Sequence, residues 1–94
     1  MNSQIPIKLD KIKKEDIDKE ILRAGIIAEL DAVNQYEQMA ALANSKTIKA
    51  LLLDIAKEEK THVGEFQALL LKLDAEQVVE LEKGRQEVEE ISRK

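Results

Sequence analysis

The sequence predicts an all-α protein, and three observations support this fold class. The composition is 36% charged and 44% hydrophobic, with one proline and 2% aromatic residues, and its Ala, Leu, Glu and Lys content favours helices. Apolar residues recur every three or four positions, which is the period of an α-helix. Two helix breaks, Asn44-Ser45 and Asp74, divide the chain. We therefore expect an antiparallel two-helix hairpin followed by a short C-terminal helix.

The first two helices are expected to form a hairpin across residues 14–73. Residues 1–13 are predicted to be a flexible lead-in, because Pro6 lacks a backbone donor and disfavours helix at the residue before it. A first helix of about residues 14–43 ends at Asn44 and Ser45, whose side chains compete for backbone hydrogen bonds. Ser45 can cap a second helix of about residues 46–73. So short a loop makes the two helices antiparallel neighbours.

The last segment, residues 74–94, is predicted to be a short C-terminal helix and tail. Asp74 is followed three residues later by Gln77, a variant of the capping box, which starts a helix of about residues 75–91. A chain of 94 residues buries only a modest fraction of its surface. Burial against a second copy is therefore expected.

Charge and composition exclude several classes of partner. The net charge of −4 is spread over interspersed signs, so no basic stripe is available for nucleic acid. The absence of cysteine rules out disulfides and thiolate zinc sites and fits a reducing compartment such as the cytoplasm. The longest apolar run, residues 39–43, is far shorter than the roughly 20 residues of a membrane span, and the first ten residues lack a signal core. We expect a cytoplasmic protein with no nucleic-acid or membrane partner.

A polar pair interrupts an apolar stripe on the second helix. Six of the eight stripe members are apolar, and their 4-3-4-3 spacing is typical of a face packed against a neighbouring helix. The exceptions are Glu59 and His62, the only histidine of the chain. The stripe comprises Ile48, Leu52, Ile55, Glu59, His62, Phe66, Leu69 and Leu73.

A matching stripe on the first helix is interrupted by one carboxylate, Glu29. Tyr36 follows it by seven residues, which places the phenol on the same face roughly 10 Å along the helix axis. The tyrosine is thus at most an indirect neighbour of Glu29 unless the partner helix brings it closer. This stripe comprises Leu22, Gly25, Glu29, Ala32, Tyr36, Met39 and Ala43.

These interruptions predict a metal site. Burying unpaired carboxylates beside an imidazole costs several kcal/mol, and a divalent cation is the simplest compensation. Glu59 and His62, at i and i+3, project from one side of their helix, and Glu29 adds an oxygen from the facing helix. A donor set of carboxylate and imidazole without sulfur suits iron or manganese, and zinc would also bind.

The number of ligands predicts a site shared between two chains. Carboxylate-bridged two-metal sites in four-helix bundles take a Glu from each of two helices and a Glu-x-x-His from each of the other two. One copy of this chain holds half of that set: Glu29, Glu59 and His62. A two-fold dimer would supply four carboxylates and two imidazoles and would complete the bundle.

Simpler interpretations of the same residues stay open. Glu59 and His62 could be a solvated i,i+3 pair worth a few tenths of a kcal/mol. Glu29 could be a buried polar residue that fixes the register between helices. Tyr36 could be a core residue with a hydrogen-bonded hydroxyl rather than a participant in catalysis.

The runs AELDAVNQYEQMA and IAKEEKTHVGEF, within residues 21–73, resemble the encapsulated ferritins, a branch of the ferritin-like superfamily. The chain is also similar to the ferritin domain fused to some archaeal encapsulins. The resemblance implies a two-helix half-ferritin whose dimers hold a di-iron centre and assemble into a ring, typically a decamer. Such proteins oxidise Fe(II) with dioxygen and deliver Fe(III) into an encapsulin shell. By position, Glu29, Glu59 and His62 would be the iron ligands, and Tyr36 the nearby aromatic residue that tunes the centre.

Two departures from the family pattern concern iron entry and recruitment to a shell. Where some members have two acids flanking the first-helix ligand, this chain has Ala28 and Asp31, so half of that entry site remains. The C-terminal EVEEISRK also differs from the Leu-containing targeting peptides of many members.

Two rival functions use the same residues. A rubrerythrin-like peroxide reductase has a similar di-iron centre but usually adds a cysteine-ligated iron. A non-catalytic oligomerisation module would use the polar stripe residues only to set dimer register.

Overall fold

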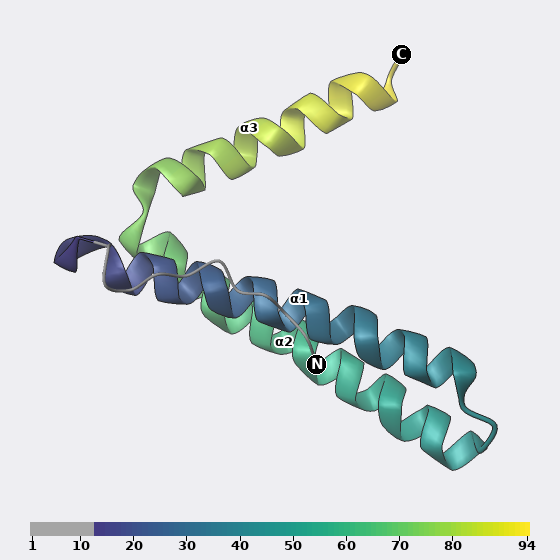
Figure 1. Ribbon diagram of the computed structural model, residues 1–94. Coiled ribbons are helices and arrows are strands. Elements are labelled where there is room, and N and C mark those ends of the chain that lie inside the picture. The colour runs from purple at the N-terminus through teal and green to yellow at the C-terminus, as the bar shows by residue number, and fades with distance from the viewer. Residues whose placement is uncertain (1–12) are drawn as a thin grey trace.

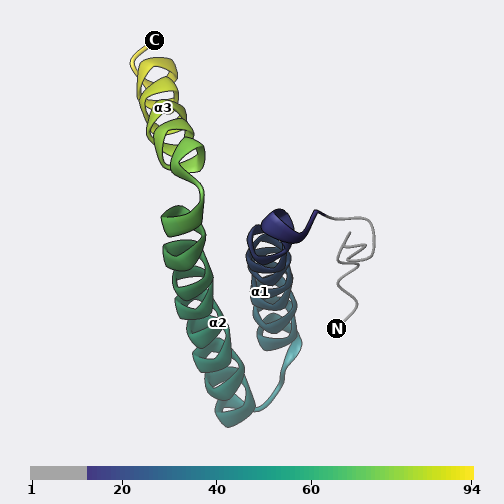
Figure 2. The same ribbon diagram turned by 90° about the vertical axis from the view of Figure 1, so that its left-hand side faces the viewer.

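The computed structural model describes residues 13–94, and the predicted all-α fold class is confirmed. A short 3₁₀ helix, η2 (Lys14–Asp16), precedes α1 (Ile17–Leu42), α2 (Lys46–Leu73) and α3 (Ala75–Ser92). Helices α1 and α2 form an antiparallel hairpin, and α3 points away from it (Figures 1 and 2). No strand occurs in this part of the chain. Apart from Lys13, the predicted lead-in of residues 1–13 lies outside the described residues.

Both predicted helix caps are present. The Ser45 Oγ accepts a hydrogen bond of 3.2 Å from the Ile48 N–H at the start of α2. The Asp74 Oδ1 accepts one of 3.0 Å from the Gln77 N–H at the start of α3. Each bond satisfies a backbone donor that has no partner inside its own helix. These two side chains therefore fix where the chain leaves one helix and begins the next.

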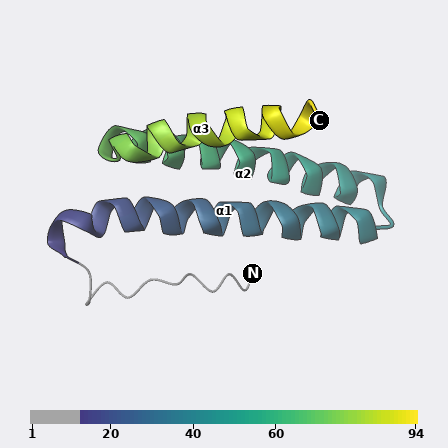
Figure 3. The same ribbon diagram turned by 90° about the horizontal axis from the view of Figure 1, so that it is seen from above.

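Asp74 also ties the α2–α3 junction to α1. Its Oδ2 accepts a hydrogen bond of 2.9 Å from the Arg23 guanidinium, 51 positions earlier in the chain. The hydrogen bond from the Gln77 N–H is the main reason that the pKa of the Asp74 carboxyl lies below its usual value, and the bond from Arg23 lowers this pKa further. Both partners favour the charged form of the carboxyl. Beyond this junction α3 diverges from the hairpin (Figure 1), and seen from above it lies over α2 rather than over α1 (Figure 3).

The single chain has a very small core. Five residues are buried within the described part: Ala32, Val33, Ala40, Ala56 and Leu70. The radius of gyration is 16.7 Å, whereas a globular domain of this length has about 12 Å. Many large apolar side chains stay exposed on all three helices, among them Ile27, Leu30, Leu42, Ile48, Leu51, Leu69, Leu81, Val88 and Ile91. Even so, none of these helices has a stretch apolar enough to cross a membrane.

The predicted α2 stripe is covered by α1 only in its central part. Leu52, Ile55 and Phe66 are half-buried, whereas Ile48 and Leu69 are 52% and 54% exposed. A stripe with a period of 3.5 drifts by about 20° per heptad around a straight helix with 3.6 residues per turn. The ends of the stripe therefore rotate away from the one helix that could cover them.

Candidate metal centre

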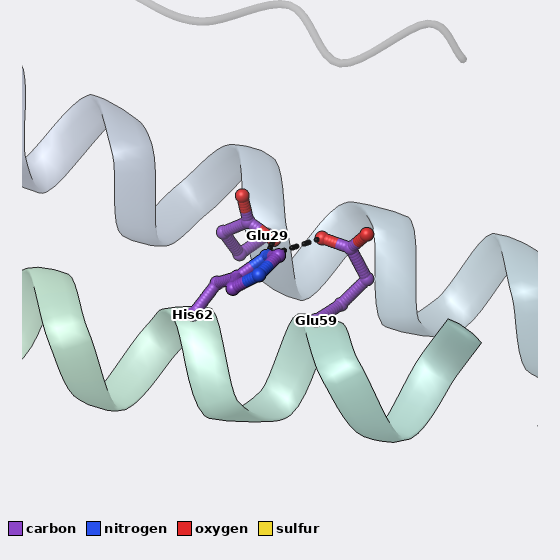
Figure 4. Close-up of side chains that lie close together, drawn as sticks. All are labelled: Glu29, Glu59 and His62. Carbon is purple, nitrogen blue, oxygen red and sulfur yellow. Dashed lines mark hydrogen bonds and ion pairs between the residues drawn. The ribbon is translucent and has the colours of Figure 1, made fainter. Parts of the chain in front are cut away.

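The three residues predicted to be metal ligands meet between the two hairpin helices. Glu29 comes from α1, and Glu59 and His62 come from adjacent turns of α2 (Figure 4). The His62 Nδ1 lies 3.3 Å from the Oε2 of Glu29 and 3.4 Å from the Oε2 of Glu59. One donor atom from each residue lies within 4.8 Å of the other two. The cluster thus combines two oxygens and one nitrogen.

The register of the antiparallel hairpin brings these side chains together. Glu59 and His62, three positions apart on α2, project from the same side of the helix. Next to them the two helices meet through small buried residues, Ala32 and Val33 of α1 and Ala56 of α2. Because these side chains are short, the helices approach closely. Glu29 can therefore reach the imidazole across the interface.

The electrostatics of the cluster are unbalanced. The side chains of Glu29 and Glu59 are each 19% exposed. Within residues 13–94 neither carboxylate is paired with Lys or Arg, and Lys60, next to Glu59 in the chain, lies 3.1 Å from Glu37 instead. Two partly desolvated carboxylates with one imidazole between them attract a cation.

The spacing of the donor atoms fits a metal ion. Three atoms within 4.8 Å of one another all lie within about 2.8 Å of a common point, and bonds from zinc to nitrogen or oxygen are about 2.0–2.2 Å. Small side-chain adjustments would close this difference. Carboxylate oxygen with imidazole nitrogen suits iron, manganese or zinc. A single chain brings three ligands, which leaves coordination positions for a second chain or for water.

His62 is more exposed than its place in the stripe predicts. Its side chain is 43% exposed, because α1 covers only one side of α2. The contact with Glu59 alone would match a solvated i,i+3 pair. The contact with Glu29, 33 positions away, distinguishes the cluster from such a local pair.

Tyr36 lies outside this cluster. It is half-buried on α1, and among the described residues its hydroxyl makes no hydrogen bond. No hydrogen bond therefore joins Tyr36 to Glu29 in this part of the chain. Its predicted catalytic role stays a prediction.

Asp31 also stands apart from the cluster. It lines a polar hollow on α1 together with Asn34, Gln35 and Gln38. Its role as the remaining half of an entry site stays a prediction.

Sequence reasoning missed one contact beside the cluster. Gly25 and Phe66 appear in the two predicted stripes, but their pairing across the hairpin was not predicted. The Phe66 ring lies directly against α1 at Gly25. The available signal was the register: Gly25 precedes Glu29 by four residues and Phe66 follows His62 by four, so the two pairs are successive layers of one antiparallel interface.

Comparisons with known proteins identify the family. Residues 20–93 match the Rubrerythrin family model. The chain is 55% identical over 86 residues to a ferritin-like-encapsulin shell fusion protein of Pyrococcus furiosus, covering 92% of this chain and 25% of that protein. It is 38% identical over 56 residues to the encapsulin nanocompartment cargo protein EncC of Myxococcus xanthus, covering 60% of this chain and 43% of that protein. The chain thus spans a quarter of the first relative and under half of the second.

A solved structure matches the whole fold. The crystal structure of an encapsulated ferritin domain from Pyrococcus furiosus superposes with a TM-score of 0.84 at 50% identity, covering 100% of this chain and 96% of that one. The chain belongs to the rubrerythrin family of ferritin-like proteins, and its fold is that of an encapsulated ferritin domain.

Proposed function

We propose that this chain is a ferroxidase domain, in which a pair of chains oxidises Fe(II) to Fe(III) with dioxygen at a shared di-iron centre. The observation that carries the proposal is the convergence of Glu29, Glu59 and His62 within 4.8 Å at the middle of the hairpin. Ferritin-like di-iron proteins use this donor set: two helices supply one Glu each, and the other two supply one Glu-x-x-His motif each. The family match agrees with it.

Each side chain has a distinct task in this proposal. Iron bound at the centre supplies the one-electron chemistry, with dioxygen as the acceptor. The carboxylates of Glu29 and Glu59 hold the iron and, being anionic, favour the higher charge of Fe(III). His62 binds through a ring nitrogen, and its position three residues after Glu59 places both side chains on the same side of α2. Tyr36, two turns from Glu29, tunes the centre from a distance.

The exposed apolar surface supports sharing of the site between copies. Large apolar side chains such as Leu30 and Leu69 are 51% and 54% exposed, against a core of five residues. Packing two hairpins together would bury part of this surface and bring a second Glu29, Glu59 and His62 to the centre. The dimer is then the unit of a larger ring, for which a decamer is the expected form.

Two relatives support an association with an encapsulin shell. One is a fusion of a ferritin-like domain with an encapsulin shell, and another is an encapsulin cargo protein. We propose that this chain likewise works inside an encapsulin nanocompartment in the cytoplasm and supplies Fe(III) for storage there. The partners are thus a second copy of the chain, the encapsulin shell protein, Fe(II) and dioxygen.

Aerobic addition of Fe(II) to the apo-protein tests the activity. Oxidation is followed by near-ultraviolet absorbance and compared with a protein-free control. Glu59→Ala is expected to reduce the rate to that of the control, whereas Glu58→Ala, which removes an exposed neighbouring carboxylate, leaves it unchanged. The proposal fails if the wild-type protein is no faster than buffer, or if Glu59→Ala oxidises iron at the wild-type rate.

Native mass spectrometry with metal analysis tests the shared centre. Zinc serves as a redox-inert ion, and its addition is expected to shift the protein toward dimers and larger rings, because a ligand that binds only the assembled form stabilises it by mass action. A monomer saturated with metal would contradict a site built from two chains.

The family match also keeps a peroxide reductase as a second candidate. The Rubrerythrin model covers residues 20–93, and such enzymes use a similar centre with hydrogen peroxide as the oxidant. The 94 residues contain no cysteine for a thiolate-bound iron. Single-turnover oxidation of the Fe(II)-loaded protein by dioxygen and by peroxide separates the two functions. Faster reaction with dioxygen is expected.

A further inference from the structure

Gly25 leaves a space on α1 that the ring of Phe66 fills. The ring of Phe66 crosses from α2 and rests on the α1 backbone at this position. A Cβ built on Gly25 would lie 2.9 Å from Cε1 and 3.0 Å from Cδ1 and Cζ of that ring. Carbon atoms pack at about 3.5–4.0 Å. The ring therefore occupies the place that an alanine methyl group would take.

The other two glycines show no such constraint. A Cβ at Gly64 or Gly84 would meet nothing within 4 Å in the same chain. All three glycines lie inside helices, where glycine is less favourable than alanine because its backbone loses more freedom on folding. The close approach of α2 thus explains why position 25 is a glycine, whereas no neighbour within the described part of this chain explains Gly64 or Gly84.

This contact adjoins the metal centre. Gly25 and Glu29 are four positions apart on α1, and His62 and Phe66 are four apart on α2, so each pair is separated by about 6 Å along the axis of its helix. On the other side of the cluster, the small residue Ala56 of α2 is only 2% exposed. The cluster therefore lies between the Gly25–Phe66 contact and a buried alanine.

We infer that Gly25 is a positioning residue for the metal centre: by letting Phe66 rest on bare backbone, it sets the helix separation at which His62 reaches Glu29. This inference rests on the proposed function. An alanine methyl group would push the ring away by about 0.5–1 Å to reach ordinary contact. The His62–Glu29 contact of 3.3 Å lies one turn away on the same two helices. Ligand geometry tolerates displacements of only about 0.5 Å.

Cobalt titration tests this inference without relying on turnover. Co(II) is a spectroscopic stand-in for Fe(II), and its visible absorption reports ligand geometry as well as occupancy. We expect Gly25→Ala to weaken Co(II) affinity by about tenfold or more, as changes to residues that orient metal ligands do, and to alter the spectrum at saturation. Gly84→Ala is the matched control, because it makes the same substitution in a helix with open space around it. It is expected to bind like wild type.

A double-mutant cycle separates positioning from general destabilisation. Phe66→Leu shortens the side chain that meets the added methyl group, so Gly25→Ala in that background is expected to cost less than threefold in affinity. The inference is overturned if Gly25→Ala alone binds Co(II) with wild-type affinity and spectrum. It is also overturned if the two substitutions weaken binding additively. Should Gly25→Ala alone not fold, the inference requires that the double variant folds and binds Co(II) within threefold of Phe66→Leu, and a larger loss overturns it.

The failure of the proposed function gives a different result. In that case the wild-type protein does not bind Co(II), or Glu59→Gln binds it as tightly as wild type does. Both outcomes are measured on wild type and on a ligand variant, so they are recognised without any variant at Gly25.

Discussion

Replacing Glu59 by glutamine should remove most of the stabilisation of the fold by zinc. The substitution keeps the shape of the side chain but removes one of the three donor groups of each chain, hence two of six in a dimer. An ion present at 100 times its dissociation constant stabilises the folded protein by about 2.7 kcal/mol per site. For a domain of this size, 1 kcal/mol corresponds to about 4–8 °C, so wild-type Tm should rise by roughly 10–20 °C. The unfolded chain has one His and no Cys and so offers zinc little to bind.

Differential scanning calorimetry at fixed protein concentration measures this shift. Glu59→Gln is expected to lose most of it, whereas Glu58→Gln should keep all of it, since Glu58 is exposed and outside the cluster. Equal zinc shifts in wild type and Glu59→Gln would refute the ligand assignment. An equal loss in Glu58→Gln would show that zinc binds through the general charge of α2 rather than at this centre.

Three further predictions concern Tyr36, Asp74 and Ala56. Tyr36→Phe should slow Fe(II) oxidation several-fold without changing the zinc shift; an unchanged rate in stopped-flow absorbance would assign Tyr36 to packing. The pKa of Asp74 is lowered, mainly by the Gln77 N–H, so its contribution to stability is present above its ordinary pKa and is lost as the pH falls through the folded value. Asp74→Asn should lower Tm at neutral pH and reduce the acid sensitivity of the melts; an equally steep acid dependence would contradict this. Ala56 is only 2% exposed, so Ala56→Leu should overpack the interface and lower the free energy of unfolding in urea by about 1–3 kcal/mol. Ala68 is exposed, and Ala68→Leu should change this free energy little.

Helix boundaries were predictable because their signals are local. The second helix begins after Ser45 and ends at Leu73 as predicted, and the third extends one residue past its predicted end, to Ser92. Side chains that compete with or complete backbone hydrogen bonds fix these positions within a few residues. The first helix begins later than predicted, because residues 14–16 adopt the tighter 3₁₀ form. The Arg23–Asp74 contact, which joins the α2–α3 junction to α1, links residues 51 positions apart, and no local pattern reveals it.

The site was predictable in its members but not in its surroundings. Glu29, Glu59 and His62 were singled out because each breaks an apolar stripe, and the hairpin register then brings them together. The exposure of His62 was not foreseen, because a stripe pattern does not tell which helix covers it. The Gly25–Phe66 contact was missed for a similar reason. Glycine carries no hydrophobic signal, and only the register in which α1 pairs with α2 shows that the Phe66 ring lies on Gly25.

Glu29 allows a test of why metal binding and assembly are linked. Two chains in a shared centre would gather four carboxylates, and two like charges about 5 Å apart repel by about 3 kcal/mol at an effective dielectric constant of 20. Glu29→Gln removes one charge from each chain and keeps the side-chain shape. Without metal, the variant should therefore dimerise more tightly than wild type, by up to about a hundredfold in Kd.

With zinc present the order should reverse, because the variant has lost two of the ligands that the ion would bridge. Sedimentation equilibrium in chelator and in zinc measures both constants. Weaker association of Glu29→Gln under both conditions would show that Glu29 holds the dimer through hydrogen bonds. In that case the carboxylates would set register, as the non-catalytic alternative requires, and the charge argument for a cation at this centre would fail.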